Sequence, residues 1–323
     1  MVARRHMLLV AACLVALGTS FASAQNYPNR PVKIIVPFGA GGPADVFARV
    51  VAEHLTQSLK QPFVVEDRPG AGSIIGTEAV HQSAPDGYTL LLMSNTHTTN
   101  ESLVQNKPFE LMRDFVPVAP INYSDLLMVV HPSVEAKNLK EFIALAKAKP
   151  GQLNYASSGP GTPYHMAGEL FKAMSGTDIV HVPHKASGDA RNSVVGGHVQ
   201  MMFDAITTML PIAEGGKVRA LATTGEKRSP LTPDLPTVAE AGVPGYEATI
   251  WLGLMAPKGT PPEVVKALNA EVNKVVDLPT VKDAWAKQGA IPMHMTPEQF
   301  DAYLRKDIEK WAQVVKASGA TVR

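Results

Sequence analysis

Apolar and polar residues alternate along the chain in two patterns, short continuous apolar runs and apolar positions at helical spacing. Residues 33–37 form a β-branched run that is typical of a buried strand, and the apolar spacing over 44–59 predicts an amphipathic helix. The same two patterns follow, with strands expected at 63–66 and 88–94 and a helix at about 74–82 between them. Because strands that alternate with helices favour parallel pairing, we expect a mostly parallel sheet here.

The alternation starts again further along the chain and predicts a second α/β unit. Strands are expected at 125–132, 153–159, 178–184, 199–205 and 218–225, with helices at 138–150, 162–176 and 186–198. Three helical segments follow, at 261–276, 278–287 and 297–318. Their patterns do not show on which half of the molecule they pack.

The first 24 residues have the pattern of a signal peptide and are set apart from the fold. Arg4 and Arg5 precede a short apolar run at 7–17, and an A-x-A cleavage sequence ends at Ala24. The apolar run is too short to span a membrane stably. We therefore expect export followed by cleavage after Ala24.

Cleavage at that position would also remove Cys13, the only cysteine of the chain. A lipoprotein site at Cys13 is the alternative, but the apolar run continues past it. Without thiols an exported protein has no disulfides, so its stability must come from its core. Of 30 basic and 29 acidic side chains, cleavage removes Arg4 and Arg5 and no acid, which leaves a net charge of about −1. That balance argues against nucleic-acid binding and against a basic membrane-surface patch.

Three strand-to-helix turns are rich in small residues. They read "FGAGGPAD" at 38–45, "RPGAGS" at 68–73 and "SSGPGTPYH" at 157–165. Glycines let backbone amides crowd together at a helix N-terminus, where unpaired N–H groups and the helix dipole attract an anion. The alternative is that the glycines only permit tight turns. Because three such turns each follow a strand, we favour a binding crevice at the carboxyl edge of the sheet.

The same turns fit nucleotide and nucleophile motifs poorly. No lysine follows Gly41 and Gly42, as a phosphate-binding P-loop requires. Ala44 and Tyr164 stand where a dinucleotide-binding fingerprint has its third glycine. The chain also has no G-x-S-x-G sequence for a nucleophile elbow. These observations weaken an enzymatic interpretation.

The histidines do not form a metal-binding pattern. His181 and His184 lie three positions apart in a strand-like segment with no carboxylate at helical spacing, so we expect no metal and no cofactor. His165 lies one turn into the helix after the third glycine-rich turn. It is placed either to donate to a bound anion or to hydrogen-bond to its own loop.

Six motifs, in chain order, resemble the extracytoplasmic solute receptors of the tripartite tricarboxylate transporter family, the Bug-type proteins. They are "YPNRPVKIIVPFGAGGPADVFAR", "VEDRPGAGSIIGTEAV", "DGYTLLL", "NYASSGPGTPYHMAGELF", "RSPLTPDLPTVAEAGVPGYE" and "WLGLMAPKGTPPEVV". The resemblance covers nearly the whole chain after the signal peptide. It implies an α/β, two-domain periplasmic-binding-protein fold of the type II-like kind, with a ligand cleft between the domains and a hinge of two crossing strands.

By this resemblance, residues 25–125 and 248–323 form the first domain and residues 126–247 the second. Such receptors hold a carboxylate mostly through backbone amides and hydroxyls of the turns that face the cleft. The implied ligand-binding residues of the first domain are Phe38, Gly39, Ala40, Gly41, Gly42, Asp45, Ser94, Asn95 and Thr96. Those of the second domain are Ser157, Ser158, Gly159, Thr162, His165 and Asp204. Asp45 is placed either to contact the ligand or to cap free amides.

The sequence departs from the family pattern at "HKASGDARNSVVGG" (184–197). Many relatives have a lysine-glycine pair, then proline-alanine, then an aspartate. Here Ser193 stands at the aspartate position and Asp189 at the proline position. Neutral drift on an exposed helix is one interpretation. The other is altered selectivity, in which Arg191 joins the ligand-binding residues and favours an anionic or neutral distal group over an ammonium.

The sequence therefore predicts a monomeric periplasmic receptor, not an enzyme. By domain closure it would capture a small carboxylate, which it would deliver to the large and small membrane subunits of a transporter. Dicarboxylates, tricarboxylates, aromatic acids and acidic amino acids all stay open as ligands. One alternative is an exported hydrolase that uses Ser157 or Ser158 with His165, although the histidine lacks an orienting carboxylate. The other is a ligand sensor that docks on a membrane signalling protein.

Overall fold

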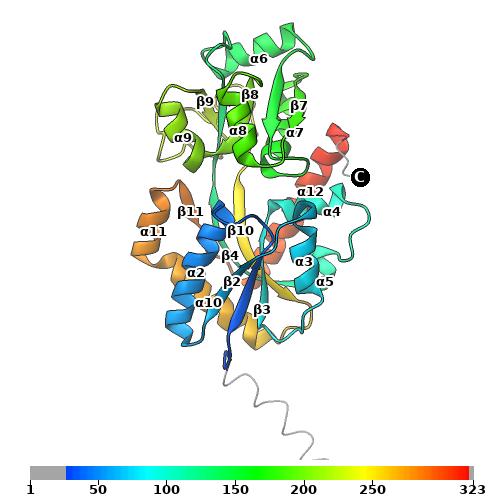
Figure 1. Cartoon of the computed structure of the whole chain (residues 1–323), viewed down its shortest axis with the longest axis vertical. Coiled ribbons are helices and arrows are strands. Elements are labelled where there is room, and N and C mark those ends of the chain that lie inside the picture. The colour runs from blue at the N-terminus through cyan, green and yellow to red at the C-terminus, as the bar shows by residue number, and fades with distance from the viewer. Residues whose placement is uncertain (1–26, 320–323) are drawn as a thin grey trace, which may run out of the picture.

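The computed structural model describes residues 27–319, which form two lobes stacked along the long axis of the molecule (Figure 1). The predicted signal peptide and its cleavage site after Ala24 lie outside the described residues. Within the described range, no helix has both the length and the apolar character needed to cross a bilayer. Each lobe is built around one β-sheet.

The lower lobe in Figure 1 contains a six-stranded mixed sheet in the order β11-β4-β10-β3-β1-β2. Its strands are β1 (Val32–Val36), β2 (Phe63–Asp67), β3 (Thr89–Ser94), β4 (Phe115–Ser124), β10 (Ile250–Pro257) and β11 (Ala290–Pro292). β1 pairs in parallel with β2 and β3, as the sequence predicts. The expectation of a mostly parallel sheet is wrong for the whole sheet, because β10 is antiparallel to β3 and β4, and β11 is antiparallel to β4.

The upper lobe contains a five-stranded sheet in the order β7-β6-β8-β5-β9. Its strands are β5 (Leu126–Val130), β6 (Asn154–Ser157), β7 (Val180–Pro183), β8 (Met201–Ala205) and β9 (Arg219–Thr223). β6 pairs in parallel with β7 and β8, whereas β5 is antiparallel to β8 and β9. All five strands fall within the ranges that the sequence predicts.

Helices cover both faces of each sheet, which is why the central strands read as continuous apolar runs. In β1, Val32, Ile34 and Val36 belong to one core cluster, and Ile35 belongs to the cluster on the other face. The lower lobe has α2 (Pro43–Leu59), the short 3-10 helix η2 (Ala71–Ser73), α3 (Ile74–His81), α4 (Asn95–Leu103), α5 (Leu111–Asp114), α10 (Pro262–Asp277) and α11 (Pro279–Ala286). The upper lobe has α6 (Leu139–Ala148), α7 (Pro163–Ser175), α8 (Ser187–Val195) and α9 (Ile206–Glu214).

The last helix, α12 (Pro297–Ser318), packs on both lobes (Figure 1). It begins at a capping box formed by Thr296 and Gln299. Its first half contributes Phe300 and Leu304 to a core cluster of the lower lobe. Its second half contributes Trp311, Val314 and Val315 to the core of the upper lobe. The helix therefore connects the two lobes in addition to the strands that cross between them.

The chain crosses between the lobes at two adjacent points. β4 ends at Ser124 and β5 begins at Leu126, and the chain returns through Ala248 into β10. Thr224 joins the two crossings, because its N–H donates to the carbonyl of Leu126 at 3.0 Å and its carbonyl accepts from the N–H of Ala248 at 3.0 Å. The predicted boundaries at residues 125 and 248 lie at these crossings. The division into two domains stays a prediction, since α12 packs on both lobes.

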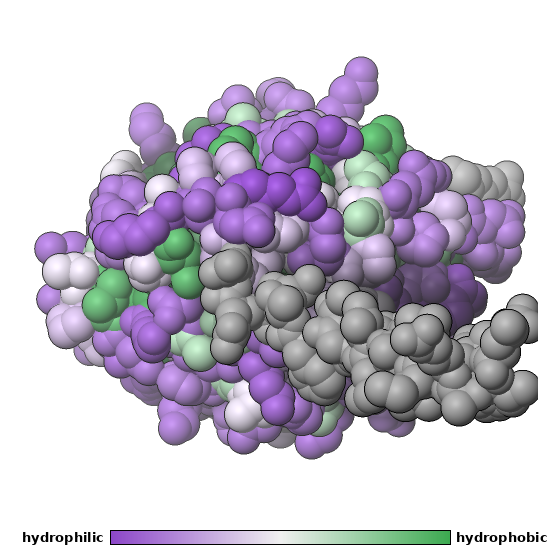
Figure 2. Space-filling model, turned by 90° about the horizontal axis from the view of Figure 1, so that it is seen from below, coloured by the Kyte–Doolittle hydropathy of each residue, from purple (hydrophilic) through white to green (hydrophobic). Residues whose placement is uncertain are grey.

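The end of the lower lobe that points away from the upper lobe is mostly hydrophilic outside the grey atoms (Figure 2). Hydrophobic residues on that face occur in small, separate patches. Scattered apolar residues of this kind are usual on an exposed surface and mark no binding site.

Candidate functional site

A cavity of about 760 Å³ lies between the two lobes. That volume is within the range usual for small-molecule sites. The lining turns follow the carboxyl ends of strands: 37–44 after β1, 69–73 after β2, Ser94 and Thr96 after β3, Ser158 and 162–164 after β6, 185–188 after β7, and Ala205 and Thr207 after β8. Phe47 of α2, Asn122 and Ser124 of β4, and Ile250 and Leu252 of β10 complete the wall. All three glycine-rich turns of the sequence meet at this cavity.

Lys185 is the only residue with a charged side chain among those that line the cavity. It lies in the turn between β7 and α8 and is exposed to solvent. The ion pairs among the described residues do not include Lys185. The other polar groups of the wall are hydroxyls, one side-chain amide and the backbone. A cation without a counter-ion in a partly enclosed cavity favours a negatively charged ligand.

Asp45 holds the turn after β1 from the side that faces away from the cavity. Gly41 has a φ of +75°, which favours glycine, and its N–H donates to the Oδ2 of Asp45 at 2.7 Å. The Oδ1 of Asp45 pairs with the Nε of Arg49 at 2.6 Å, and the Nη2 of Arg49 lies 3.0 Å from Asp67. Burial, and then the charge of Asp45, raise the pKa of Asp67. Asp45 is buried and does not line the cavity, so it caps a loop amide.

Three amides of this turn are free, while the N–H of Gly42 donates to the carbonyl of Gly39 at 3.3 Å. Within residues 27–319, no hydrogen bond is made by the backbone N–H groups of Phe38, Gly39 and Ala40. α2 starts with Pro43 at its first position and has no side-chain cap at Gly42. The first N–H groups of a helix lack partners within the helix, and their partial positive charge attracts anions. This turn therefore presents several unpaired donors at the wall of the cavity.

The turn after β2 has an unusual run of left-handed backbone. The φ angles of Gly70, Ala71, Gly72 and Ser73 are +136°, +47°, +61° and +79°. Asn100 of α4 holds the turn, because its Nδ2 donates to the carbonyl of Gly72 at 2.8 Å. Left-handed non-glycine residues such as Ala71 and Ser73 are strained and cluster at functional sites. The sequence indicates this turn through its glycines, but its residues were not among the predicted ligand-binding set.

The turn after β3 forms a capping box at the start of α4. The Oγ of Ser94 accepts from the N–H of Thr96 at 3.2 Å, and the N–H of Ser94 donates to the Nδ1 of His97 at 3.2 Å. Burial lowers the pKa of His97 to about 4, so the ring is neutral at pH 7 and can accept this bond. The Nδ2 of Asn95 points instead to the carbonyl of Thr249 in the return crossing, at 3.2 Å. Ser94 and Thr96 line the cavity, and Asn95 holds the return crossing.

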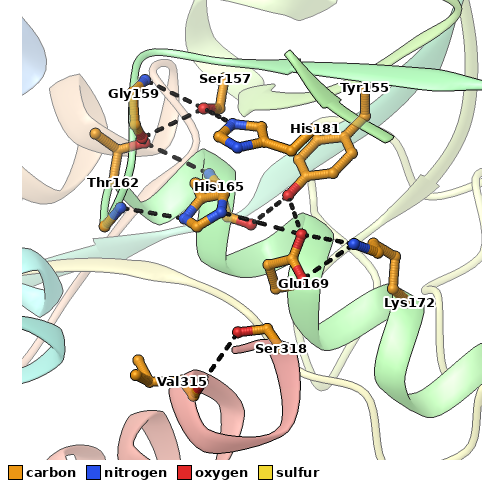
Figure 3. A network of polar contacts seen from close by, with 11 residues as sticks. Tyr155, Ser157, Gly159, Thr162, His165, Glu169, Lys172, His181, Val315 and Ser318 are labelled. Atoms are coloured by element: carbon orange, nitrogen blue, oxygen red, sulfur yellow. Dashed lines mark hydrogen bonds and ion pairs between the residues drawn. The ribbon is translucent and has the colours of Figure 1, made fainter. Parts of the chain in front are cut away.

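The turn after β6 rests on a buried network (Figure 3). The Oγ of Ser157 lies 2.6 Å from the Nε2 of His181 and accepts from the N–H of Gly159 at 3.1 Å. The N–H of Gly161 donates to the Nδ1 of His165 at 3.1 Å. Thr162 caps α7, with its Oγ1 accepting from the N–H of His165 at 3.4 Å. His165 therefore bonds to its own loop, which is one of the two possibilities that the sequence left open.

The network does not form the predicted pairing of a hydrolase. Ser157 bonds to His181 rather than to His165, and its relative exposure is 0%. A nucleophile must be within reach of a substrate. Ser157 does not line the cavity, and Ser158, which does, makes no hydrogen bond to either histidine among the described contacts.

Arg191 and Asp204 pair with each other inside the upper lobe. The Nε of Arg191 donates to the Oδ2 of Asp204 at 2.7 Å, and its Nη2 donates to the Oγ1 of Thr208 at 3.2 Å. The Oδ1 of Asp204 accepts from the N–H of Ala205 at 2.8 Å. Burial raises the pKa of Asp204, and the bond to Arg191 opposes that effect. The charge of Arg191 is thus compensated within the protein.

The structure sorts the predicted ligand-binding residues into two groups. Those that line the cavity are Phe38, Gly39, Ala40, Gly41, Gly42, Ser94, Thr96, Ser158 and Thr162. Those that lie behind its wall are Asp45, Asn95, Ser157, Gly159, His165, Arg191 and Asp204. Contact with a ligand stays a prediction for all of them, and the second group would reach a ligand only after the wall moved.

Several lining residues were missed from sequence. Lys185, Ser187 and Gly188 lie in a turn after a predicted strand, so the rule that selected the other turns could have found them. Asn122 and Ser124 had no such signal, because β4 itself was not predicted. Within residues 27–319, no group of three or more His, Cys, Asp or Glu side chains is arranged to hold a metal ion.

Residues 47–320 match the family model described as tripartite tricarboxylate transporter family receptor. The chain is 40% identical to the protein BugT of Bordetella pertussis over 303 residues, which cover 93% of each sequence. Among solved structures, it resembles a protein of R. palustris determined with adipate, with a TM-score of 0.83, 34% identity, and coverage of 91% of this chain and 98% of the other.

A second solved structure is MatC from Rhodopseudomonas palustris with bound malate. Its TM-score is 0.79 at 32% identity, over 90% of this chain and the whole of the other at 100%. At these identities the similarity extends beyond the general fold. The matches confirm the expected fold class, an α/β periplasmic-binding-protein fold with two sheets and a cleft between the lobes.

Proposed function

This chain belongs to the receptors of the tripartite tricarboxylate transporter family, and from that membership we propose that it captures a small carboxylate between its lobes and delivers it to a membrane transporter. Members of this family are solute-binding receptors of the periplasm. Two structurally similar proteins were solved with carboxylates, one with adipate and one with malate. Both ligands are dicarboxylates, so a dicarboxylate is the first class to test.

The observation that carries the proposal is the charge of the cavity. Lys185 is the only charged side chain in its wall, and no acid faces it there. Opposite the upper lobe, the turn after β1 offers the unpaired N–H groups of Phe38, Gly39 and Ala40. Charge-assisted hydrogen bonds from such donors to a carboxylate are roughly twice as strong as neutral ones. The site is therefore suited to an anion and unsuited to a cation.

In the proposed complex each lobe supplies part of the site. One carboxylate lies against the free amides of the turn after β1, with the hydroxyls of Ser94 and Thr96 beside it. Ser158, Thr162 and Lys185 of the upper lobe hold the rest of the ligand. Because one ligand contacts both lobes, its binding favours closure about the two crossing strands. Binding and closure require no covalent chemistry, so we propose a receptor without enzymatic activity.

The proposal includes the route of the protein and its partners. Residues 1–24 direct export, cleavage follows Ala24, and the monomeric receptor acts in the periplasm. The large and small membrane subunits of the transporter recognise the closed form, in which residues 126–247 move as one domain against 25–125 and 248–323. The second half of α12, which packs on the upper lobe, then moves with that lobe or slides along it.

A thermal-shift screen of the mature chain against carboxylates tests the function. The panel includes adipate, L-malate, citrate, benzoate and L-glutamate. A ligand present at 100 times its dissociation constant stabilises the native state by about 2.7 kcal/mol, which is easily detected. At least one carboxylate is expected to raise the melting temperature. A panel without any stabilising member would contradict the proposal.

The matched pair Lys185→Met and Lys217→Met separates the role of the cavity cation from general charge. Lys217 is an exposed lysine of the same lobe that does not line the cavity. Loss of one charge-assisted bond of about 1.5 to 3 kcal/mol should weaken binding more than ten-fold in Lys185→Met. Lys217→Met should bind as the wild type does. Equal binding by both variants would remove Lys185 from the site but leave carboxylate capture intact.

A further inference from the structure

Two histidines, the buried His165 and the half-buried His181, hold the turn after β6 from behind, and the proposed function assigns them no role. We propose that His165 and His181 are positioning residues that fix the cavity wall at residues 158–162, each through a different ring nitrogen. The proposal rests on the proposed function in one respect, which is that this wall serves to hold a ligand. Its test uses the protein without ligand, so the two proposals can fail separately.

His165 acts through its Nδ1 atom. The N–H of Gly161 donates to this nitrogen at 3.1 Å, so Nδ1 carries no proton and the ring proton lies on Nε2. Nε2 faces the Oε1 of Glu169 at 4.0 Å (Figure 3). Glu169 is itself held by the hydroxyl of Tyr155 at 2.5 Å and by the Nζ of Lys172 at 3.0 Å. The bond from Gly161 therefore sets the tautomer, and Glu169 at 4.0 Å is too far from Nε2 to accept a hydrogen bond.

His181 acts through its Nε2 atom, and the hydroxyl of Ser157 lies between this atom and the loop. Nε2 lies 2.6 Å from the Oγ of Ser157, and the same oxygen accepts from the N–H of Gly159 at 3.1 Å. The two histidines therefore hold the two glycines on either side of Pro160. The rings lie side by side, with centroids 4.1 Å apart. Neither ring touches the cavity, so their effect on a ligand must pass through the loop.

We call the hydrogen bonds that hold Gly159 and Gly161 tethers. The loop needs them because its two glycines allow the backbone many conformations. Gly159 and Gly161 have φ angles of +114° and +76°, and glycine loses more conformational freedom on ordering than any other residue. The Oγ1 of Thr162 donates to the carbonyl of Gly159 at 2.7 Å and closes the turn. Ser158 and Thr162, the residues that line the cavity, are attached to these two glycines. Releasing either glycine would move a part of the wall.

The environment keeps both rings neutral, as the acceptor role of His165 requires. Burial lowers the pKa of His165 to about 4, with a smaller effect of Lys172 in the same direction. Burial and then His165 lower the pKa of His181 to about 3. Glu169 opposes this effect on His181, while Lys172 and His184 add to it. At pH 7 the tethers are therefore intact.

The alternative is that the two rings only fill space against Tyr155, on which both stack. Side chains of similar size would then serve equally well at both positions. The tether interpretation predicts otherwise, because it depends on which ring nitrogen makes the bond. The oxygen of asparagine lies near the position of Nδ1, and the end of glutamine lies near that of Nε2.

Four single variants exploit this difference. His165→Asn and His181→Gln keep a polar group where the tether needs one, whereas His165→Gln and His181→Asn remove it. The measurement is the exchange rate of the Gly159 and Gly161 amide protons by NMR in the ligand-free mature chain. Loss of one such hydrogen bond, worth about 0.5 to 1.5 kcal/mol, corresponds to exchange roughly 2 to 13 times faster. We expect faster exchange at Gly161 in His165→Gln and at Gly159 in His181→Asn only.

Equal exchange in the two variants at each position would overturn the proposal and leave the rings as space-filling groups. If a variant does not fold, the nitrogen chemical shifts of the imidazole rings in the wild type still decide between the tether and the space-filling interpretations. They should report His165 as the Nε2–H tautomer with Nδ1 as an acceptor. A proton on Nδ1 would contradict the bond from Gly161. Carboxylate binding measured separately shows whether the proposed function stands.

Discussion

The turn after β1 and the turn after β6 carry similar strings of small residues, yet they use their backbone amides in different ways. In the first, Phe38, Gly39 and Ala40 keep free N–H groups. In the second, the N–H groups of Gly159 and Gly161 are already bonded to Ser157 and His165. Both turns line the same cavity, from opposite lobes.

The comparison shows that glycine-rich sequence alone does not make an anion site. What decides is whether a side chain behind the turn has already taken the amide. In the first turn Asp45 takes the amide of Gly41 and the carbonyl of Gly39 takes that of Gly42, which leaves those of Phe38, Gly39 and Ala40 for a ligand. In the second turn, Ser157, which bonds to His181, takes the amide of Gly159 and the neutral ring of His165 takes that of Gly161, so the wall is held from behind. The upper lobe then contributes through the side chains of that wall and through Lys185.

The largest expected difference between the turns is in the unfolding free energy that is lost when valine replaces one glycine of each turn. A Cβ at Gly161 would lie 2.5 Å from the Cδ2 of Leu103, whereas nothing lies within 4 Å of one at Gly41. Both glycines have positive φ, which costs a valine about 1 to 3 kcal/mol. Overpacking adds about 1 to 3 kcal/mol at Gly161 only.

Gly161→Val should therefore lose roughly 2 to 6 kcal/mol of unfolding free energy and Gly41→Val roughly 1 to 3 kcal/mol. Urea unfolding measures both. Gly39→Ala is the control, because Gly39 has open space around it and no positive φ. An equal or larger loss in Gly41→Val would mean that the first turn is packed at least as tightly as the second.

The second expected difference is in pH dependence, because only the second turn is held by histidines. The pKa of His165 falls from 6.5 to about 4 on folding, so the unfolded chain binds this proton more readily. The contribution of His165 to stability is complete above about pH 6.5, falls as the pH drops, and is lost below about pH 4. His165→Asn, which cannot titrate, should lose less stability on acidification.

The difference between wild type and His165→Asn should reach on the order of 2 to 3 kcal/mol between pH 7 and pH 4. Urea unfolding at several pH values gives both curves. Asp45→Asn, which changes the first turn, serves as the comparison and should leave this histidine-dependent loss in place. Parallel curves for wild type and His165→Asn would show that the ring does not change its proton affinity on folding.

Sequence predicted the outer parts of this fold better than its centre. The range 297–318 for α12 agrees with the observed Pro297–Ser318, because apolar spacing and a Thr-Pro start are local signals. The central strand β4 was missed, since Pro117 and Pro120 interrupt it and read as breakers. β10 was also missed, and its Gly253 is explained by its neighbours in space, because a Cβ there would meet Phe300 of α12 and the carbonyl oxygen of Ala119 in β4.

The cavity was predicted in the same uneven way. Small-residue turns after strands are visible in sequence, and they do meet at the cavity. Sequence shows charges but not their partners, so Arg191 was chosen although it pairs with the buried Asp204. Lys185, six residues earlier, has no such partner among residues 27–319 and was left out. Only the three-dimensional arrangement separates a compensated charge from a free one.

The smallest expected effect concerns the single tether of the first turn. Asp45→Ala removes the acceptor for the N–H of Gly41, while Asp45→Asn keeps an oxygen near the same position. Loss of a capping acceptor typically costs about 0.5 to 2 kcal/mol. Asp45→Ala should therefore be less stable than Asp45→Asn by about that amount in urea unfolding. If both variants lose the same stability, the ion pair with Arg49 matters rather than the amide bond.

The division of roles between the two turns is tested most directly by backbone amide chemical shifts during titration with a carboxylate found in the screen. The account predicts large shifts for the free amides of Phe38, Gly39 and Ala40. It predicts small shifts for Gly159 and Gly161, whose N–H groups already have partners. Large shifts at the two glycines with none at Phe38 to Ala40 would contradict it.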